Sequence, residues 1–111
     1  MFQRLISRIL KGEGAAGRID VSMVDDKKIR GLNRRFRKKD RPTDVLAFSY
    51  DGGKVLGDVI ISRDTARRNA RRYGVSFRAE LKRLVIHGAL HVLGYDHGRK
   101  MRNAEKIYAQ F

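Results

Sequence analysis

The sequence predicts an α+β fold, with a small mixed β-sheet of three to four strands flanked by helices. Three segments rich in β-branched and aromatic residues, 19–24, 45–50 and 55–62, alternate with segments whose apolar residues recur at helical spacing. A further helix, expected from residue 76 onward, is apolar around most of its circumference, which suits a central position in such a domain. The 111 residues contain no internal repeat or low-complexity linker, so residues 1–111 are expected to form a single domain.

The first half of the chain is expected to begin with a short amphipathic helix over residues 2–10, which the following glycines interrupt. Residues 19–24 then alternate apolar and polar side chains at first, as in a half-buried strand. The next helix begins at Asp25 or Asp26, either of which can cap it, and ends at Pro42. Its inner side is expected to carry Ile29, Leu32, Asn33 and Phe36.

The second half is expected to hold two strands and three helices. The strands cover residues 45–50 and 55–62, and the turn Asp51-Gly52-Gly53 joins them. The helices follow in order: one capped by Ser62 or Asp64 and closed by Gly74, one beginning at Ser76, and one over residues 101–111. Strands and helices therefore interleave along the chain, which fits an α/β or an α+β domain with a small sheet.

The charge of the chain points to a polyanionic partner. Twenty-six basic residues oppose twelve acidic ones, and the net charge of +14 is far beyond what solubility needs. Nucleic acid is the first expectation, ahead of a membrane surface, and the alternative is a surface laced with salt bridges. Two groups are predicted to bind RNA, one in the basic run 34–41 and one on a helical stripe: Arg34, Arg35, Lys38 and Lys39, and then Arg67, Arg68, Arg71 and Arg72.

Several classes of protein are disfavoured by composition. The chain has no cysteine, which excludes disulfides, thiol chemistry and cysteine-ligated zinc. The N-terminal segment carries Arg4 and Arg8 within its apolar pattern, unlike a signal peptide. No apolar run approaches the roughly 20 residues of a membrane span. A cytoplasmic protein that does not enter the membrane is therefore expected.

Three histidines, the only ones in the chain, predict a metal site. His87 and His91 are four residues apart on the expected helix and therefore share a face. Gly94 allows the chain to leave the helix in a left-handed turn, which can bring His97 back to the pair. Three imidazoles with an open fourth position describe a catalytic zinc site, with one Zn²⁺ per chain. The alternative is that these histidines are hydrogen-bonded core residues or cap the helix end.

The spacing H-x-x-x-H-x-x-G-x-x-H is that of the metzincin proteases, with one difference. Those enzymes carry a catalytic Glu after the first histidine, and this chain has Gly88 there. The metal-binding spacing is thus kept while the protease general base is missing, so a zinc peptidase is disfavoured. Glu80 lies on nearly the same helical line as His87. It either faces the metal or only favours the helix N-terminus, and the sequence leaves both open.

The segment from His87 to His97 resembles the signature of the YbeY family of zinc-dependent endoribonucleases. Residues 32–48 and 57–62 resemble two further blocks of that family, in the same order along the chain. The resemblance covers about residues 32–110, although this chain has Ala47 where the family usually has serine. It implies a small sheet flanked by helices and zinc held by three histidines in a cleft.

The resemblance also implies a function for the chain. That function is single-strand-specific cleavage of RNA in 16S rRNA 3′-end maturation and in ribosome quality control. Ribosomal RNA would be the partner, together with proteins of the small ribosomal subunit. The zinc ligands would be His87, His91 and His97, and Arg37 would be a functionally important residue in the cleft. A non-catalytic, zinc-containing ribosome assembly factor is the alternative.

The chemistry of such a site follows only in part from the residues. Zinc held by three neutral imidazoles acidifies a bound water, and either water or a ribose 2′-OH is then the nucleophile. Arg37 would neutralise the phosphate oxygens, where charge develops. Because Gly88 cannot accept a proton, Asp96 and Glu80 are the candidate proton acceptors. Asp96 could instead orient a histidine ligand.

Overall fold

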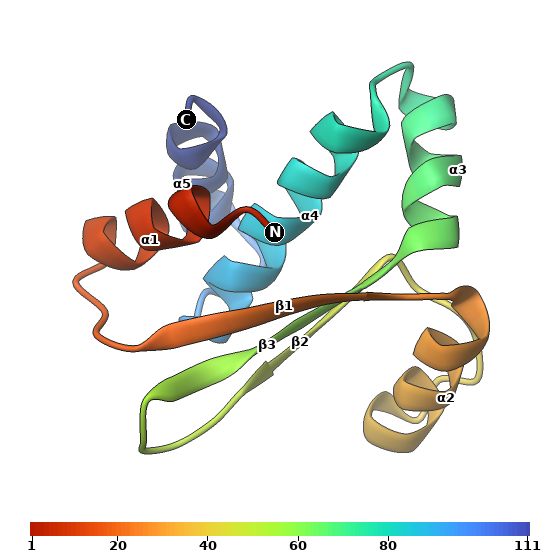
Figure 1. The fold of residues 1–111 in the computed structure, drawn as a ribbon, viewed down its shortest axis with the longest axis horizontal. Helices are drawn as coiled ribbons and strands as arrows, with labels where there is room; N and C mark the ends of the chain where they lie inside the picture. Colours follow the sequence, from red (N-terminus) through yellow and green to blue (C-terminus); the bar gives the residue numbers. More distant parts are fainter.

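The computed structural model describes all residues from 1 to 111 and shows the predicted α+β fold (Figure 1). The elements along the chain are α1 Gln3–Gly12, β1 Arg18–Val24, α2 Asp26–Arg37, β2 Val45–Ser49, β3 Val55–Ser62, α3 Arg63–Tyr73, α4 Phe77–Val92 and α5 Arg99–Ala109. None of these helices is both long enough and apolar enough to cross a lipid bilayer.

The three strands form one mixed sheet in the order β1-β3-β2. Strand β1 runs parallel to β3, so that Val21 lies beside Val59, and β2 runs antiparallel to β3, so that Ala47 lies beside Val59 from the other side. The sequence predicted a mixed sheet of this size. Because β2 pairs with β3 alone, its outer edge is free, and this edge becomes one wall of the functional site.

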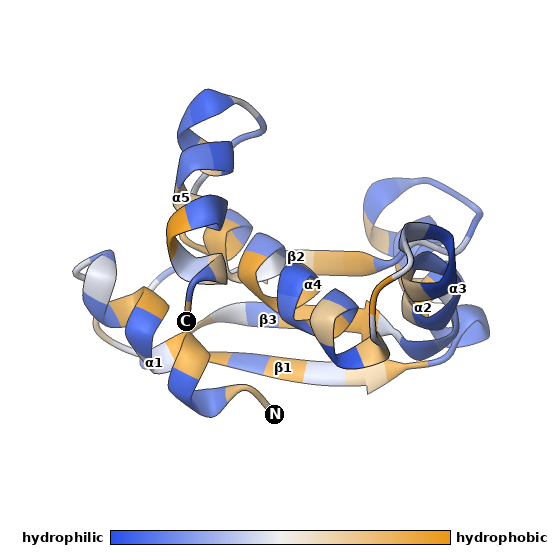
Figure 2. Cartoon of the chain, turned by 90° about the horizontal axis from the view of Figure 1, so that it is seen from above, coloured by the Kyte–Doolittle hydropathy of each residue, from blue (hydrophilic) through white to orange (hydrophobic).

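Helix α4 covers one face of the sheet and carries the core of the molecule. Val85 and Ala89 of α4 are fully buried, as are Val59 and Ile61 of β3. The helix approaches the sheet so closely that a Cβ atom at Gly88 would lie 2.5 Å from Cγ1 of Val59, so only glycine fits there. The strands and α4 carry many of the hydrophobic residues, whereas α3 is mostly hydrophilic (Figure 2).

The other helices surround α4 or close the sheet. Helices α1, α3 and α5 pack around α4 on the same face of the sheet, and α2 lies on the opposite face (Figure 1). A side chain caps the first turn of each of α2, α3 and α4 by accepting a hydrogen bond from a backbone N–H. The capping residues are Asp25, Ser62 and Ser76 respectively. Where the sequence left two candidate caps open for a helix, the cap is therefore Asp25 rather than Asp26 for α2, and Ser62 rather than Asp64 for α3.

Helix α2 ends five residues earlier than predicted, at Arg37 rather than at Pro42. Lys38 takes the left-handed conformation with φ of 59°, and the side-chain amide of Asn33 donates to the carbonyl of Arg41. These contacts turn the chain back toward β2. Phe36 was expected on the inner side of α2, but it is 52% exposed and packs edge-on against Phe48.

Candidate metal centre

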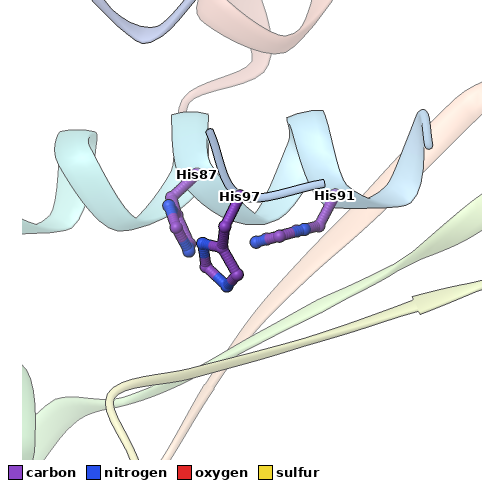
Figure 3. Close-up of side chains that lie close together, drawn as sticks. All are labelled: His87, His91 and His97. Carbon is purple, nitrogen blue, oxygen red and sulfur yellow. The ribbon is translucent and has the colours of Figure 1, made fainter. Parts of the chain in front are cut away.

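The three histidines meet at the C-terminal end of α4. His87 and His91 project from successive turns of the helix, and Gly94, with φ of 99°, turns the chain so that His97 returns to them (Figure 3). One ligand atom from each ring can be chosen so that all three lie within 4.8 Å of one another. Tetrahedral zinc places its ligand nitrogens about 3.4 Å apart, so the group can hold one ion after a small closing movement.

Two of the three rings are already oriented for a metal. Nδ1 of His87 lies 3.1 Å from a carboxylate oxygen of Glu105 on α5, and Nδ1 of His91 lies 2.9 Å from the carbonyl oxygen of Tyr95. These contacts leave the Nε2 atom of each ring as the ligand. Metal-binding histidines commonly donate their second N–H in this way, which fixes the ring and its tautomer. Three neutral nitrogen donors suit zinc and similar transition metals.

Burial favours the neutral form of His91. The pKa of His91 is lowered below its ordinary value, first because the ring is partly desolvated and second because His87 lies beside it. The carbonyl of Tyr95 opposes this shift only in part. The neutral imidazole is the form that binds a metal, so the environment of His91 prepares it for that role.

The loop that carries His97 is tied to the N-terminal part of the chain. The hydroxyl of Tyr95 donates to Glu13 at 2.6 Å, and the hydroxyl of Tyr108 donates to the same carboxylate at 2.5 Å. Burial and this carboxylate raise the pKa of Tyr108 to about 12, so its hydroxyl stays a donor. Because the carbonyl of Tyr95 orients His91, Glu13 helps to position a histidine from a distant part of the chain.

The histidines lie at the floor of a cleft of about 730 Å³. Its walls are the end of α4, the loop 94–97, the free edge of β2 and the segment that follows α2. The hydroxyl of Ser49 donates to the carbonyl of Val92 at 2.9 Å and so joins the β2 wall to the end of α4. Only four of the seventeen lining residues are hydrophobic, which suits a polar or charged ligand.

Three basic side chains line this cleft without a carboxylate partner: Arg37, Lys39 and Arg41. Arg37 is the best positioned of them. Its guanidinium donates to the outward-pointing carbonyl of Ala47 at 2.6 Å and lies 5.0 Å from the ring centre of Phe48. The β2 edge thus fixes the side chain and leaves its charge unpaired beside the histidines.

The sequence profile of a family described as "Endoribonuclease YbeY" matches residues 1–110. The chain belongs to the YbeY family. An Endoribonuclease YbeY from Aquifex aeolicus is 54% identical over 93 residues, which are 80% of this chain and 62% of that protein. One from Carboxydothermus hydrogenoformans is 47% identical over 95 residues, 83% of this chain and 66% of that protein. The chain therefore spans less than two thirds of the length of either relative.

A solved structure has the same fold. The solution structure of a protein from Thermotoga maritima superposes with a TM-score of 0.73 at 34% sequence identity. The match covers 98% of this chain and 77% of that one. The family match confirms the resemblance that the histidine motif indicated, and the solved structure supports the predicted fold class.

Two predicted proton acceptors of this YbeY chain have different surroundings. Asp96 lines the cleft and is exposed. Glu80 does not line it. Its carboxylate is 1% exposed and accepts two hydrogen bonds from Arg83, at 2.8 and 2.7 Å, and one from Asn69 at 3.0 Å. These contacts make Glu80 a buried anchor between α3 and α4, about two turns before His87 along α4 and outside the metal cleft.

Most of the predicted RNA-binding residues also lie outside the cleft. Of the first group only Lys39 lines it, and Arg34, Arg35 and Lys38 do not. None of the arginines on the α3 stripe lines it. Arg68 pairs with Asp26 at 2.6 Å, and Arg67 lies over the ring of Phe77.

The structure adds residues that the sequence did not single out. Glu105, Tyr95 and Glu13 orient the histidines and their loop, and Arg41 and Asp44 line the cleft. Glu105 follows His97 by eight residues on a helix with no recognisable motif. Its only sequence signal is that it is the one acidic residue of that helix. Asp44 accepts a hydrogen bond from Asn69 at 3.2 Å, which links the cleft to Glu80.

Proposed function

We propose that the chain is a zinc-dependent endoribonuclease that cleaves single-stranded RNA in 16S rRNA 3′-end maturation and ribosome quality control. The observation that carries this is the convergence of three histidines beside the unpaired guanidinium of Arg37, in a polar cleft. A site with nitrogen ligands for a metal next to a free cation suits a phosphodiester. The names of the YbeY relatives support RNA as the polymer and endonucleolytic cleavage as the reaction.

Arg37 would hold the reacting phosphate. Its guanidinium is fixed by the carbonyl of Ala47, and the remaining N–H groups can donate to the non-bridging oxygens. Negative charge grows on these oxygens in the transition state, so a preorganised cation stabilises it more than the ground state. Lys39 and Arg41, at the rim of the same cleft, would bind the flanking phosphates.

His87, His91 and His97 would hold the zinc ion. When bound, it supplies a Lewis acid that polarises the phosphate and lowers the pKa of water. Asp96 is the exposed carboxylate of the cleft and would accept the proton of the attacking water or 2′-OH on a carboxylate oxygen. The new P–O bond forms as the bond to the leaving ribose oxygen breaks, and the leaving oxygen takes up a proton.

The test is cleavage of a fluorescent single-stranded RNA by the purified chain, with and without a chelator. Cleavage should stop with the chelator and return with zinc. Elemental analysis should give about one zinc per chain, which His87→Ala with His91→Ala removes. Cleavage that is equally fast in His91→Ala would sink the proposal and identify a contaminating nuclease. The ends of the products distinguish the two nucleophiles, because attack by a 2′-OH leaves a cyclic phosphate.

A non-catalytic assembly factor is the second candidate, and one observation favours it. The position that holds the proton acceptor in metzincins is Gly88, and the side chain of Val59 leaves no room for a larger residue there. If Asp96 cannot replace that acceptor, the site binds RNA and zinc without turnover. Tight, salt-sensitive RNA binding with no cleavage at any zinc concentration would establish this candidate over the first.

A further inference from the structure

A second basic groove lies between α1, α5 and the N-terminal half of α4, and it shares no residue with the metal cleft. It consists of two adjoining hollows of about 920 and 420 Å³, both of which include Arg4 and Phe111. We call it the α1–α5 groove and define it by six residues: Arg4, Arg8, Lys11, Arg78, Lys82 and Phe111.

The positive charge of the α1–α5 groove is not compensated within the chain. None of its five cations forms an ion pair, although six other basic or histidine side chains of the protein do. Lys82 donates only to the carbonyl of Ala109. The one acidic side chain in the groove is that of Glu13, and it already accepts the hydroxyls of Tyr95 and Tyr108.

Three of the cations form a row along α1. Arg4, Arg8 and Lys11 are spaced four and three residues apart, so they lie on one exposed face of the helix. The row is about 10 Å long, because an α-helix rises 1.5 Å per residue. A row of this kind fits a charged polymer better than a single small anion.

The groove also presents aromatic rings. Phe111 is 57% exposed, and the guanidinium of Arg8 lies 4.2 Å from its ring centre. Arg78 lies 4.9 Å from the ring centre of Phe2, which is partly exposed and packs against the core on its other side. Exposed rings interleaved with arginines are the usual means of holding single-stranded nucleic acid, since bases stack on the rings while cations contact phosphates.

We propose that the α1–α5 groove is a second binding surface for single-stranded RNA, which anchors the strand away from the metal cleft. The proposal rests on the proposed function only in its choice of RNA as the polymer. A lipid surface is disfavoured, because the apolar face of α1 is buried in the core, with Leu5, Ile6 and Ile9 at most 8% exposed. A helix without a free apolar face cannot insert into a bilayer.

The test compares two variants of equal charge in the full chain. One is Arg4→Gln/Arg8→Gln/Lys11→Gln, and the control is Lys27→Gln/Lys28→Gln/Lys54→Gln, whose side chains are exposed and form no ion pair. Binding of a long labelled single-stranded RNA is measured by fluorescence anisotropy over a salt series, with chelator present to prevent cleavage. Circular dichroism of the wild type and of both variants confirms that each is folded.

The groove variant should bind the long RNA about tenfold more weakly than the control. Its slope of log K against log salt should fall by about 2, because each lost phosphate contact on a single strand removes about 0.7. Cleavage of an RNA too short to leave the metal cleft should be unchanged. Equal losses in both variants, or no loss in either, would overturn the proposal. Weaker binding to phosphatidylserine vesicles with unchanged RNA binding would assign the groove to membranes instead.

The two proposals fail in different ways. If the chain never cleaves RNA, the anisotropy experiment still measures RNA binding by the groove, because binding requires no turnover. If short RNA is cleaved but the groove variant binds long RNA normally, the groove proposal alone is wrong.

Discussion

The two arginine-rich stretches of this chain, residues 34–41 and the stripe on α3, are both strongly basic but have different surroundings. The first follows the end of α2 and turns back along the β2 edge, so that Arg37, Lys39 and Arg41 face the metal cleft. The second is part of a regular helix at the far end of the sheet, and none of its arginines reaches the cleft. Density of charge in a sequence therefore indicates a polyanion partner, but only the path of the backbone decides which charges meet the reacting group.

The partners of the arginines explain this difference. Arg37 donates to a backbone carbonyl, which fixes the side chain without neutralising it. Arg68 on α3 instead donates to Asp26, which also accepts the hydroxyls of Ser62 and Thr65. This carboxylate joins the start of α2 to the start of α3, so the α3 stripe contributes to the fold more than to the cleft.

The largest expected difference between the two stretches is in catalysis. Arg37→Ala should lower kcat for RNA cleavage about a hundredfold to a thousandfold, as removal of a preorganised transition-state donor does. Arg72→Ala, which removes one exposed arginine of the α3 stripe, should change kcat by less than about threefold. Both are measured by single-turnover cleavage with zinc at saturation. Similar losses in the two variants would show that total charge matters and position does not.

The next effect is on the stability of the fold and concerns the contacts of Asp26 at the start of α3. Asp26→Ala should destabilise the fold by about 2–3 kcal/mol, because it removes the acceptor for the fully buried hydroxyl of Ser62 and for Thr65. Arg37→Ala should change the free energy of unfolding by less than about 1 kcal/mol, since its bond to Ala47 is exposed. Urea denaturation followed by circular dichroism measures both. A larger loss in Arg37→Ala would mean that Arg37 is a structural residue.

Local signals in the sequence were sufficient for most of the fold. Ser62 and Ser76 cap their helices through contacts three residues away, and the histidines at positions 87 and 91 share a face by helical spacing alone. The predicted end of α2 was wrong, because the position of this end depends on a contact across a loop, from the side chain of Asn33 to the carbonyl of Arg41. No pattern within α2 records that contact.

The candidate site likewise has features that local sequence signals predict and features that depend on distant contacts. The gathering of the three histidines follows from one helix and one glycine turn. The groups that orient them do not, because Glu13 meets Tyr95 across 82 positions of the chain. Helical spacing put Glu80 in line with His87, but seven residues separate them by about 10 Å along α4. At that distance α4 contacts α3, and the carboxylate meets Arg83 and Asn69 instead of the cleft.

A smaller effect is expected on RNA affinity at the rim of the cleft. Lys39→Ala with Arg41→Ala should raise KM for single-stranded RNA about tenfold and leave kcat nearly unchanged, because these side chains bind flanking phosphates in ground and transition state alike. Arg71→Ala with Arg72→Ala removes the same charge from the α3 stripe and is the matched control. A rise in KM that is equal in both double variants would extend the RNA path onto α3.

The smallest effect is a dependence of stability on pH that belongs to Asp26. Burial acts to raise the pKa of this carboxyl, but the hydrogen bonds from Ser62, Thr65 and Arg68 outweigh it, and the pKa lies below 3.8. A carboxyl with a lowered pKa stabilises the fold above its unfolded pKa and loses that contribution as the pH falls through the folded value. The difference in unfolding free energy between the wild type and Asp26→Asn should therefore be constant above about pH 5 and shrink below about pH 4. Taking the difference cancels protonation of the histidines, which both proteins share. A difference that widens in acid would mean that a group other than Asp26 joins α2 to α3.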